Sequence, residues 1–274
     1  MGAAADKDSL PPFDTSVANP ARILDYWLGG NDNFPADQEA AEAILEIMPS
    51  VSQTARISRR FLVDVVRRLM LEVGIRQFLD IGSGLPTADN THEVAQRTTP
   101  EARVVYVDND PLVLAHARAL LTSTPEGKCA YLHADLRDIA QILHRAADTL
   151  DFSQPIGILL IGILHFIPDS EDPYGITRSL MAAVPSGSYL VVGHGASDIQ
   201  PEVVAEVNER YNEHSAVAGI LRSREGVTRF FEGLKLMPPG VVPLHRWWET
   251  DPEMAASVKG LGVCTTYVGA GRKL

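Results

Sequence analysis

Residues 78–86, with the sequence Phe-Leu-Asp-Ile-Gly-Ser-Gly-Leu-Pro, constrain the fold of this chain more than any other segment. Four residues that can form a short buried strand are followed at once by two glycines, Gly82 and Gly84. Glycine adopts positive φ readily and lets a ligand come close to the backbone. In open α/β sheets, ligands bind at the carboxyl ends of the strands, which is where this turn would lie. The segment therefore predicts an α/β fold with a binding site at that edge.

Two further apolar runs end in a carboxylate, and each follows the run before it by about one βα unit. Residues 104–107 lead into Asp108, and residues 129–134 lead into Asp135. A carboxylate at the second strand end suits the vicinal diol of a ribose. One at the third strand end can accept a hydrogen bond from the exocyclic amine of adenine. Together the strand ends predict a nucleoside site formed by Asp80, Gly82, Ser83, Gly84, Asp108, Asn109, Asp135 and Leu136.

Each of the three carboxylates could instead have a structural role. Asp110 directly precedes Pro111, and both residue types are favoured at the start of a helix, so we expect Asp110 to be the cap and Asp108 to be available for ribose. Asp135 could cap the next helix, although we favour contact with adenine. Asp80 lies inside its strand, and we expect it to support the glycine loop from behind.

The glycine loop distinguishes between nucleosides. A dinucleotide fingerprint has a third small residue, G-x-G-x-x-G/A, which lets the helix pack closely against a pyrophosphate. Here the loop reads Gly-Ser-Gly-Leu-Pro-Thr, and Pro86 has no N–H to donate. S-adenosylmethionine has no phosphate, so this loop favours that cofactor over NAD(P).

Three segments carry a resemblance to a known family. They are residues 20–34 (Pro-Ala-Arg-Ile-Leu-Asp-Tyr-Trp-Leu-Gly-Gly-Asn-Asp-Asn-Phe), residues 75–87 and residues 164–169. In these segments the chain resembles the actinobacterial S-adenosylmethionine-dependent methyltransferases that were formerly catalogued as a domain of unknown function, except that the family usually has lysine at the position of Asn31. The resemblance implies a class I methyltransferase fold, that is, a Rossmann-like, mostly parallel sheet, and it implies binding of S-adenosylmethionine. It implies no particular methyl acceptor.

The order of elements agrees with this fold class. Apolar runs predict strands that end near residues 81, 108, 133, 161 and 193, with helices near 89–98, 111–122, 137–147, 174–184 and 201–213. Such alternation predicts a parallel sheet with right-handed crossovers. Residues 224–234 are predicted to be a further helix, and residues 241–242 and 264–268 are the last strand candidates. We expect a tail over residues 1–19 and a single domain over 20–274, in which residues 20–74 form an N-terminal helical cap on the α/β core of 75–274.

Composition limits location and partners. The net charge of −11 disfavours a nucleic-acid substrate, because phosphate binding needs a basic surface. The two cysteines are far apart and are expected to be reduced, and no zinc-binding spacing is present. The longest apolar run, residues 156–164, is too short to cross a bilayer, and no signal peptide is recognisable. We therefore expect a cytoplasmic protein without a metal site.

The residues that would act on an acceptor are less well marked. Tyr26 and His165 are the candidate general bases, because they lie in the cap segment and directly after the fourth strand. Candidate substrate contacts are Asn31, Asn33 and His194; each histidine could equally be bonded to backbone.

Two further groups have competing interpretations. One of three arginines on the long helix of residues 52–73 could pair with the methionyl carboxylate of the cofactor, although a solvated charged face explains all three; they are Arg56, Arg59 and Arg60. The pair Trp247 and Trp248 is expected to pack rather than to bind substrate.

The most consistent function is methyl transfer from S-adenosylmethionine to a small-molecule acceptor. Two alternatives remain, a non-catalytic S-adenosylmethionine-binding sensor or partner protein and an NAD(P)-dependent oxidoreductase. The oligomeric state cannot be inferred from the sequence.

Overall fold

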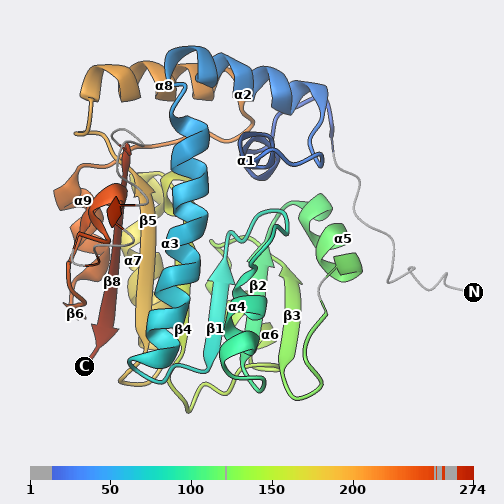
Figure 1. Cartoon of the computed structure of the whole chain (residues 1–274), viewed down its shortest axis with the longest axis vertical. Coiled ribbons are helices and arrows are strands. Elements are labelled where there is room, and N and C mark those ends of the chain that lie inside the picture. Colours follow the sequence, from blue (N-terminus) through green and yellow to red (C-terminus); the bar gives the residue numbers. More distant parts are fainter. Residues whose placement is uncertain (1–13, 121, 250, 252–254, 257–263) are drawn as a thin grey trace, which may run out of the picture.

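An open sheet of eight strands forms the centre of the protein (Figure 1). The computed structural model describes residues 14–120, 122–249, 251, 255–256 and 264–274. Seven strands follow the order β3-β2-β1-β4-β5-β8-β6, and β7 also pairs with β8. The strands are β1 (Gln77–Ile81), β2 (Arg103–Asp108), β3 (Lys128–His133), β4 (Gly157–Ile161), β5 (Tyr189–Gly195), β6 (Leu234–Leu236), β7 (Val242–Pro243) and β8 (Thr266–Lys273).

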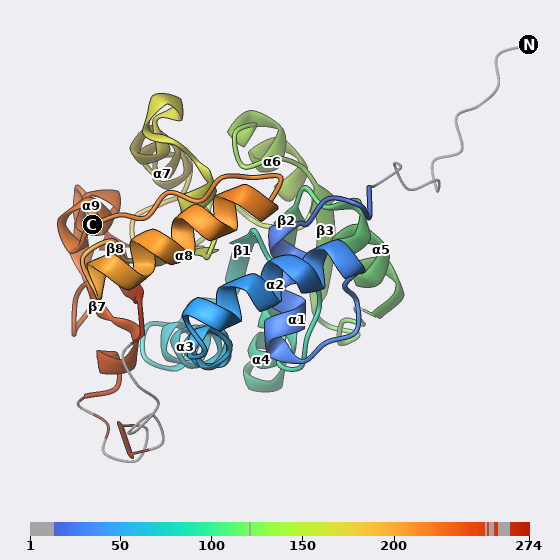
Figure 2. The ribbon, with the colours of Figure 1, turned by 90° about the horizontal axis from the view of Figure 1, so that it is seen from above.

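Helices lie on both faces of the sheet and above one edge (Figures 1 and 2). The α-helices are α1 (Pro20–Leu28), α2 (Pro35–Ile47), α3 (Val51–Leu71), α4 (Thr91–Thr98), α5 (Pro111–Leu120), α6 (Ile139–Ala146), α7 (Pro173–Ala182), α8 (Pro201–His214) and α9 (Arg224–Thr228). Short 3₁₀ helices are η1 (Leu164–Phe166), η2 (Asp169–Glu171), η3 (Arg229–Phe231) and η4 (Leu244–Arg246). In the described part of the chain, no helix combines the length and apolar character needed to cross a bilayer.

The parallel half of the sheet brings the predicted site residues to one edge. β1 pairs in parallel with β2 and β4, β2 with β3, and β4 with β5. The register sets Ile81 beside Val107 and Asp108 beside His133, so the carboxyl ends of these strands are adjacent. The strand ends predicted from the apolar runs are therefore confirmed for β1 to β4.

Three helices form a layer above that carboxyl edge, and we call α1, α2 and α8 the cap (Figures 1 and 2). α1 begins at Asn19, whose side chain accepts from the amide of Ala21, and it ends at Gly29, which has φ 84°. α2 and α8 pack through Ile44 and Val207 among other apolar residues. The cap thus combines the N-terminal segment with a helix from far along the chain.

The cap is composed differently from the sequence-based prediction. α3, which was predicted to belong to it, packs on the sheet instead: Phe61, Val65 and Val66 are buried in one cluster with Phe78 of β1. The limit of the predicted tail also differs. Ala18 is buried and forms a bridge with Ser215 after α8, while residues 1–13 lie outside the described part of the chain.

The C-terminal strands differ most from the sequence-based prediction. A strand was predicted at residues 264–268, but β8 begins at Thr266 and continues to Lys273, antiparallel to β5. Its glycines hide the strand pattern, and they are needed because Phe231 lies against them: a Cβ on Gly271 would be 2.8 Å from that ring. The predicted helix over residues 224–234 begins where expected but is shorter: α9 and the 3₁₀ turn η3 end before Gly233, which has φ 78°, and β6 follows.

Candidate active site

The glycine loop after β1 has the tight geometry expected of it. Gly82 and Gly84 have φ of 74° and 66°, a region that disfavours side chains. The Gly82 amide donates to Val107 O of β2 at 2.8 Å. A Cβ on Gly82 would be only 2.6 Å from the Cβ of Ile163, in the loop after β4. The loop is therefore held closely between the ends of β2 and β4.

Asp108 holds the glycine loop with the same carboxylate that was predicted to bind ribose. One oxygen accepts from the Gly84 amide at 2.9 Å, and the other accepts from the Asp110 amide at 3.0 Å. The side chain is buried, with 9% exposure for the residue, and burial raises its pKa although both amides oppose this. Each oxygen keeps a second lone pair, so hydroxyl groups can still donate to it. The predicted capping role of Asp110 is confirmed, because its carboxylate accepts from the Leu112 amide at 2.8 Å.

Asp135 and Asn109 meet beyond the ends of β2 and β3. The Asn109 amide donates to Asp135 Oδ2 at 3.3 Å, and Asp135 also accepts from the backbone amide of Arg137 at 2.8 Å. Burial of Asp135 acts to raise its pKa, but the hydrogen bonds and charge of Arg137 dominate together and lower it. Leu136 beside it is buried. A half-exposed carboxylate next to an apolar side chain can bind the edge and face of a purine.

Asp80 and Arg59 lie on a narrow cleft behind the glycine loop. Asp80 is buried, accepts from Thr91 Oγ1 at 2.7 Å, and has its pKa raised to about 6 by burial. Arg59 is the partly buried member of the three arginines on α3; Arg56 and Arg60 are exposed. The Arg59 Nε atom is buried without a hydrogen-bond partner. The cleft is lined by Arg59, Asp80, Ser83, Gly84, Pro86, Asn90, Thr91, Tyr106 and Tyr131.

This cleft is large enough for one small group at the end of a ligand, but not for the rest of the ligand. Its volume is about 10 Å³, which is close to the space for one water-sized group. Ser83 closes one side through a 3.0 Å hydrogen bond between its hydroxyl and that of Tyr131. The unpaired Arg59 Nε can receive a carboxylate here, and Arg suits that geometry. No group of three or more side chains suited to holding a metal ion occurs among the described residues.

In the cap segment, Tyr26 and Asn33 form hydrogen bonds with other residues of the cap. The Tyr26 hydroxyl donates to Glu42 of α2 at 2.8 Å, and this hydrogen bond raises the pKa of Tyr26. A tyrosine in that state is a poor base at neutral pH. Asn31 is exposed. The Asn33 amide donates to Asp25 Oδ2 at 2.8 Å and to Gly30 O at 3.1 Å, so Asn33 closes the Gly-Gly turn.

Asp25 is the centre of that turn, and the sequence-based reasoning missed it. It is buried and accepts from the Asp32 amide at 2.9 Å as well as from Asn33. A Cβ on Gly30 would lie 2.0 Å from its carboxylate, so only glycine fits there. The signal was present, because Asp25 lies inside the segment that is most typical of the family.

His165 and His194 lie next to each other at the ends of β4 and β5, with ring centroids 5.6 Å apart. His194 is fully buried: its Nδ1 donates to Gly195 O at 2.8 Å, and its Nε2 accepts from Arg222 at 2.9 Å. His165 Nδ1 is buried without a hydrogen-bond partner. Burial, with the nearby Arg222 guanidinium, lowers the pKa of His165 to about 4, and burial lowers that of His194 to about 3. Both rings are therefore neutral at physiological pH.

Arg222 is the group that organises this region, and no local sequence signal marks it. It is 5% exposed, and its guanidinium also donates to Leu164 O, Ile167 O and Asp169 Oδ1 at 3.1, 2.9 and 2.6 Å. Arg222 thereby fixes the loop after β4 that carries His165.

The buried histidines predict how stability depends on pH. Between pH 6.5 and about 4 the unfolded chain takes up protons on His165 and His194 that the folded protein does not, so the free energy of unfolding should decrease as pH falls. Asp80 and Asp108, whose pKa values burial raises, act in the opposite direction, so the contribution of His165 is read from the difference between the unmodified protein and a variant. In urea titrations at pH 7, 6 and 5, His165→Gln should reduce this dependence by up to about 1.4 kcal/mol per pH unit. An unchanged dependence would mean that His165 titrates normally.

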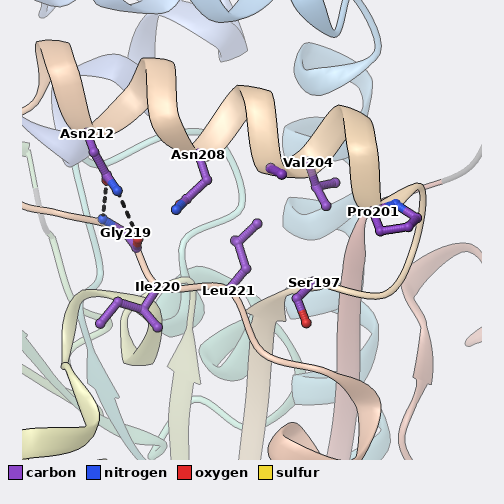
Figure 3. Close-up of a pocket in the computed structure, with 9 residues that line it drawn as sticks. Ser197, Pro201, Val204, Asn208, Asn212, Gly219, Ile220 and Leu221 are labelled. Carbon is purple, nitrogen blue, oxygen red and sulfur yellow. Dashed lines mark hydrogen bonds between the residues drawn. The ribbon is translucent and has the colours of Figure 1, made fainter.

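A groove lies beside this region, between α8 and residues 219–221 (Figure 3). Its volume is about 400 Å³, and no charged side chain of the described part of the chain lines it. The lining residues are Ser197, Pro201, Val204, Ala205, Asn208, Asn212, Gly219, Ile220 and Leu221. Asn212 bonds to Gly219, accepting from its amide at 2.7 Å, whereas the Asn208 side chain has no hydrogen-bond partner among the described residues. One face of α8 thus lines the groove, while another face, with Val203, Val207 and Tyr211, packs on α2.

Comparisons with known proteins agree with this geometry. The chain matches the model of the S-adenosyl methyltransferase family over residues 6–273. A DUF574 family protein from Streptomyces avermitilis has 43% identity and a TM-score of 0.91, over 95% of this chain and 99% of that one. A methyltransferase described as putative, from Thermobifida fusca, has 38% identity and a TM-score of 0.85, over 95% and 96%. No curated protein matches the chain.

More distant structures share the fold alone. The mitomycin 7-O-methyltransferase has 17% identity and a TM-score of 0.52, over 97% of this chain and 74% of that one. The predicted class I fold and the predicted cofactor are confirmed, and neither the sensor nor the oxidoreductase finds support. This chain belongs to the S-adenosyl methyltransferase family and is an S-adenosylmethionine-dependent methyltransferase.

Proposed function

We propose that this enzyme methylates a small, uncharged and mostly apolar acceptor that binds in the groove between α8 and residues 219–221. The lining of this groove, which contains no charged side chain among the described residues, carries the proposal. A charged acceptor would lose its hydration there without gaining a partner, which is costly. The volume of about 400 Å³ is within the usual range for small-molecule sites. The unpaired Asn208 amide can orient one polar group of the acceptor.

The groove adjoins the cofactor edge through a short series of contacts. The Ile220 amide, in the groove wall, donates to His165 O at 2.7 Å. Two residues before His165, Ile163 lies against Gly82 of the glycine loop. β4, which precedes this loop, is also the neighbour of β1 in the sheet. These contacts support an acceptor site on the β4–β5 side and a cofactor on the β1–β2–β3 side.

In this proposal the cofactor lies along the carboxyl ends of three strands. Arg59, at the cleft, would hold the methionyl carboxylate, and Gly84 would let the chain of the cofactor pass close to the backbone. The ribose hydroxyl groups would donate to the free lone pairs of Asp108, next to Asn109. Asp135 and Leu136 would bind the adenine edge and face. Asp80 would not touch the cofactor. It would support the site from behind by accepting a hydrogen bond from Thr91 and by its charge interaction with Arg59.

The chemistry asked of the protein is mainly alignment. S-adenosylmethionine supplies an activated methyl group, and the chain has to orient the acceptor toward it and exclude water. His165 can accept a hydrogen bond from an acceptor hydroxyl through its unpaired Nδ1. Its pKa of about 4 makes it inefficient as a proton acceptor, so we assign it orientation rather than general-base catalysis.

The composition of the chain also bears on the class of acceptor and on the location of the enzyme. A net charge of −11 favours a small-molecule acceptor over nucleic acid, and two free cysteines agree with a cytoplasmic location. We also propose that residues 20–274 act as one domain, because the cap joins α1 and α2 to α8 of the core segment.

Ala205→Trp should abolish binding of a neutral aromatic alcohol in the groove and leave the cofactor site intact. The probe is 2-naphthol, followed by saturation-transfer NMR in the presence of S-adenosylhomocysteine, with 2-naphthoate as the charged comparison. We expect 2-naphthol to bind to the unmodified protein and 2-naphthoate not to, since the groove offers no cation.

Glu206→Trp is the matched control, because Glu206 is exposed on α8 and does not line the groove. It adds the same side chain to the same helix and should keep 2-naphthol binding. Equal 2-naphthol signals from both tryptophan variants would show that the acceptor binds elsewhere. Transfer of a labelled methyl group to 2-naphthol, lost in the same variant, would establish the groove as the catalytic acceptor site.

A further inference from the structure

Arg22 of α1 lies between two buried carboxylates that come from different parts of the chain. Its Nε is 3.4 Å from Asp110 Oδ2, and its Nη1 is 3.6 Å from Asp37 Oδ2. The exposed fractions of the three residues are 4% for Arg22, 0% for Asp37 and 3% for Asp110. One guanidinium thus forms ion pairs with a carboxylate of the cap and with a carboxylate at the carboxyl edge of the sheet.

Asp37 ties this cluster to the cap. Its Oδ1 accepts from the Asn19 amide at 2.8 Å, and its Oδ2 accepts from the Phe34 amide at 2.9 Å. Asn19 and Phe34 are the N-cap residues of α1 and α2. The position of Asp37 is therefore fixed by the starts of both cap helices.

Asp110 ties the cluster to the proposed ribose site. Its amide donates to Asp108 Oδ1, and the other oxygen of Asp108 accepts from Gly84. Asp110 Oδ2 is buried, accepts no hydrogen bond, and faces Arg22. The charge of Arg22 is thus what balances this oxygen in the folded protein.

We propose that Arg22 is a positioning residue that couples cofactor binding to docking of the cap, with Asp110 as the relay. Removing Arg22 leaves two buried carboxylates without their cation, which the structure can relieve by separating the cap from the loop between β2 and α5. Asp108 then loses its fixed neighbour. Coupling between two sites is reciprocal. Cofactor binding must therefore stabilise the docked cap by the same free energy by which docking of the cap strengthens cofactor binding.

Titration calorimetry with S-adenosylhomocysteine tests the coupling directly. Arg22→Met and Asp110→Asn should each weaken binding at least tenfold, and Arg22→Lys should recover part of the loss. The double variant Arg22→Met/Asp110→Asn should bind S-adenosylhomocysteine no more weakly than the weaker-binding single variant, because both changes remove the same ion pair. Independent losses that multiply in the double variant would overturn the proposal.

Ile44→Ala is the matched control, because Ile44 is buried between α2 and α8 and lies outside the cluster. It should lower the melting temperature as a cap mutation does while leaving the affinity within twofold of the unmodified protein. S-adenosylhomocysteine should slow amide hydrogen exchange over residues 20–34 in the unmodified protein and in Ile44→Ala, but not in Arg22→Met. A merely structural role for Arg22 would give the same affinity and exchange in Arg22→Met as in Ile44→Ala.

The proposal rests on the assigned role of Asp108, so Asp108→Ala, which removes both acceptor oxygens, is measured alongside. Normal affinity in Asp108→Ala would refute the ribose assignment and the relay through Asp108, and weak binding in Arg22→Met would then support a coupling of the cap to the cofactor by another route. Normal affinity in a folded Arg22→Met protein would refute the coupling alone. If Arg22→Met does not fold, the comparison of Arg22→Lys with Asp110→Asn gives the same decision.

Discussion

Arg222→Met should lower the free energy of unfolding by about 3 kcal/mol, because two buried acceptors, Ile167 O and His194 Nε2, lose their donor. Each unsatisfied buried group costs about 1–3 kcal/mol. The loop after β4 should also loosen, since the guanidinium joins it to β5. Urea denaturation gives the stability. The imidazole resonances of His165 report on the loop, because its pKa of about 4 should move toward 6.5 when the ring becomes solvated.

Arg178→Met is the matched control for this change. Arg178 pairs with Asp172 at 3.4 Å, but both side chains are largely exposed, at 56% and 67%. Surface ion pairs of this kind contribute at most about 1 kcal/mol. Similar losses in the two variants would mean that the network around Arg222 is no stronger than a surface pair.

Asp108→Ala should weaken binding of S-adenosylmethionine at least tenfold. Hydrogen bonds to a charged group contribute about 1.5–3 kcal/mol each, and the change also removes the acceptor for the Gly84 and Asp110 amides. Asp108→Asn is an intermediate case, because asparagine keeps the shape and one acceptor oxygen but loses the charge and the second acceptor. Calorimetry measures the affinity, and circular dichroism checks that the sheet is intact.

Asp138→Ala serves as the control for loss of a carboxylate near the same strands. Asp138 caps α6 by accepting from the Gln141 amide at 3.0 Å, so its loss should cost about 1 kcal/mol of stability. The affinity for S-adenosylmethionine should not change. Unaltered affinity in Asp108→Ala as well would assign Asp108 to supporting the loop alone.

The sequence predicts the carboxyl ends of β1 to β4 well because their signals are local. The apolar run before Gly82 predicts a strand, and the glycine that follows predicts where that strand ends. The run before Asp108 does the same, because Pro111 follows it within three residues. The same holds for the cap of α5 at Asp110. The class of fold follows from the repeat of such units, so β1 to β4 could be placed before any coordinates were known.

The parts that were missed depend on partners distant in sequence. Arg222 bonds to Asp169 across 53 residues, and nothing beside it in the chain marks that role. β8 was placed too early because two of its alternate positions are glycines that receive Phe231. For α3, the apolar stripe predicts a helix with a buried face but does not say that the partner is the sheet. Tyr26 was chosen for its place in a typical segment, while Glu42, which raises its pKa, is contributed by the next helix.

If the groove binds the acceptor as proposed, the two faces of α8 allow acceptor preference to evolve separately from stability. Val203 and Val207 hold the helix on α2, whereas Ala205 and Asn208 line the groove. The centres of the two pairs are about 150° apart around the helix axis, by the 100° per residue of an α-helix. Substitutions on the groove face can change the size and polarity of the space without disturbing the contacts that keep the cap in place. Homologous enzymes with this architecture can therefore diversify their chemistry by changing a few positions on one helix.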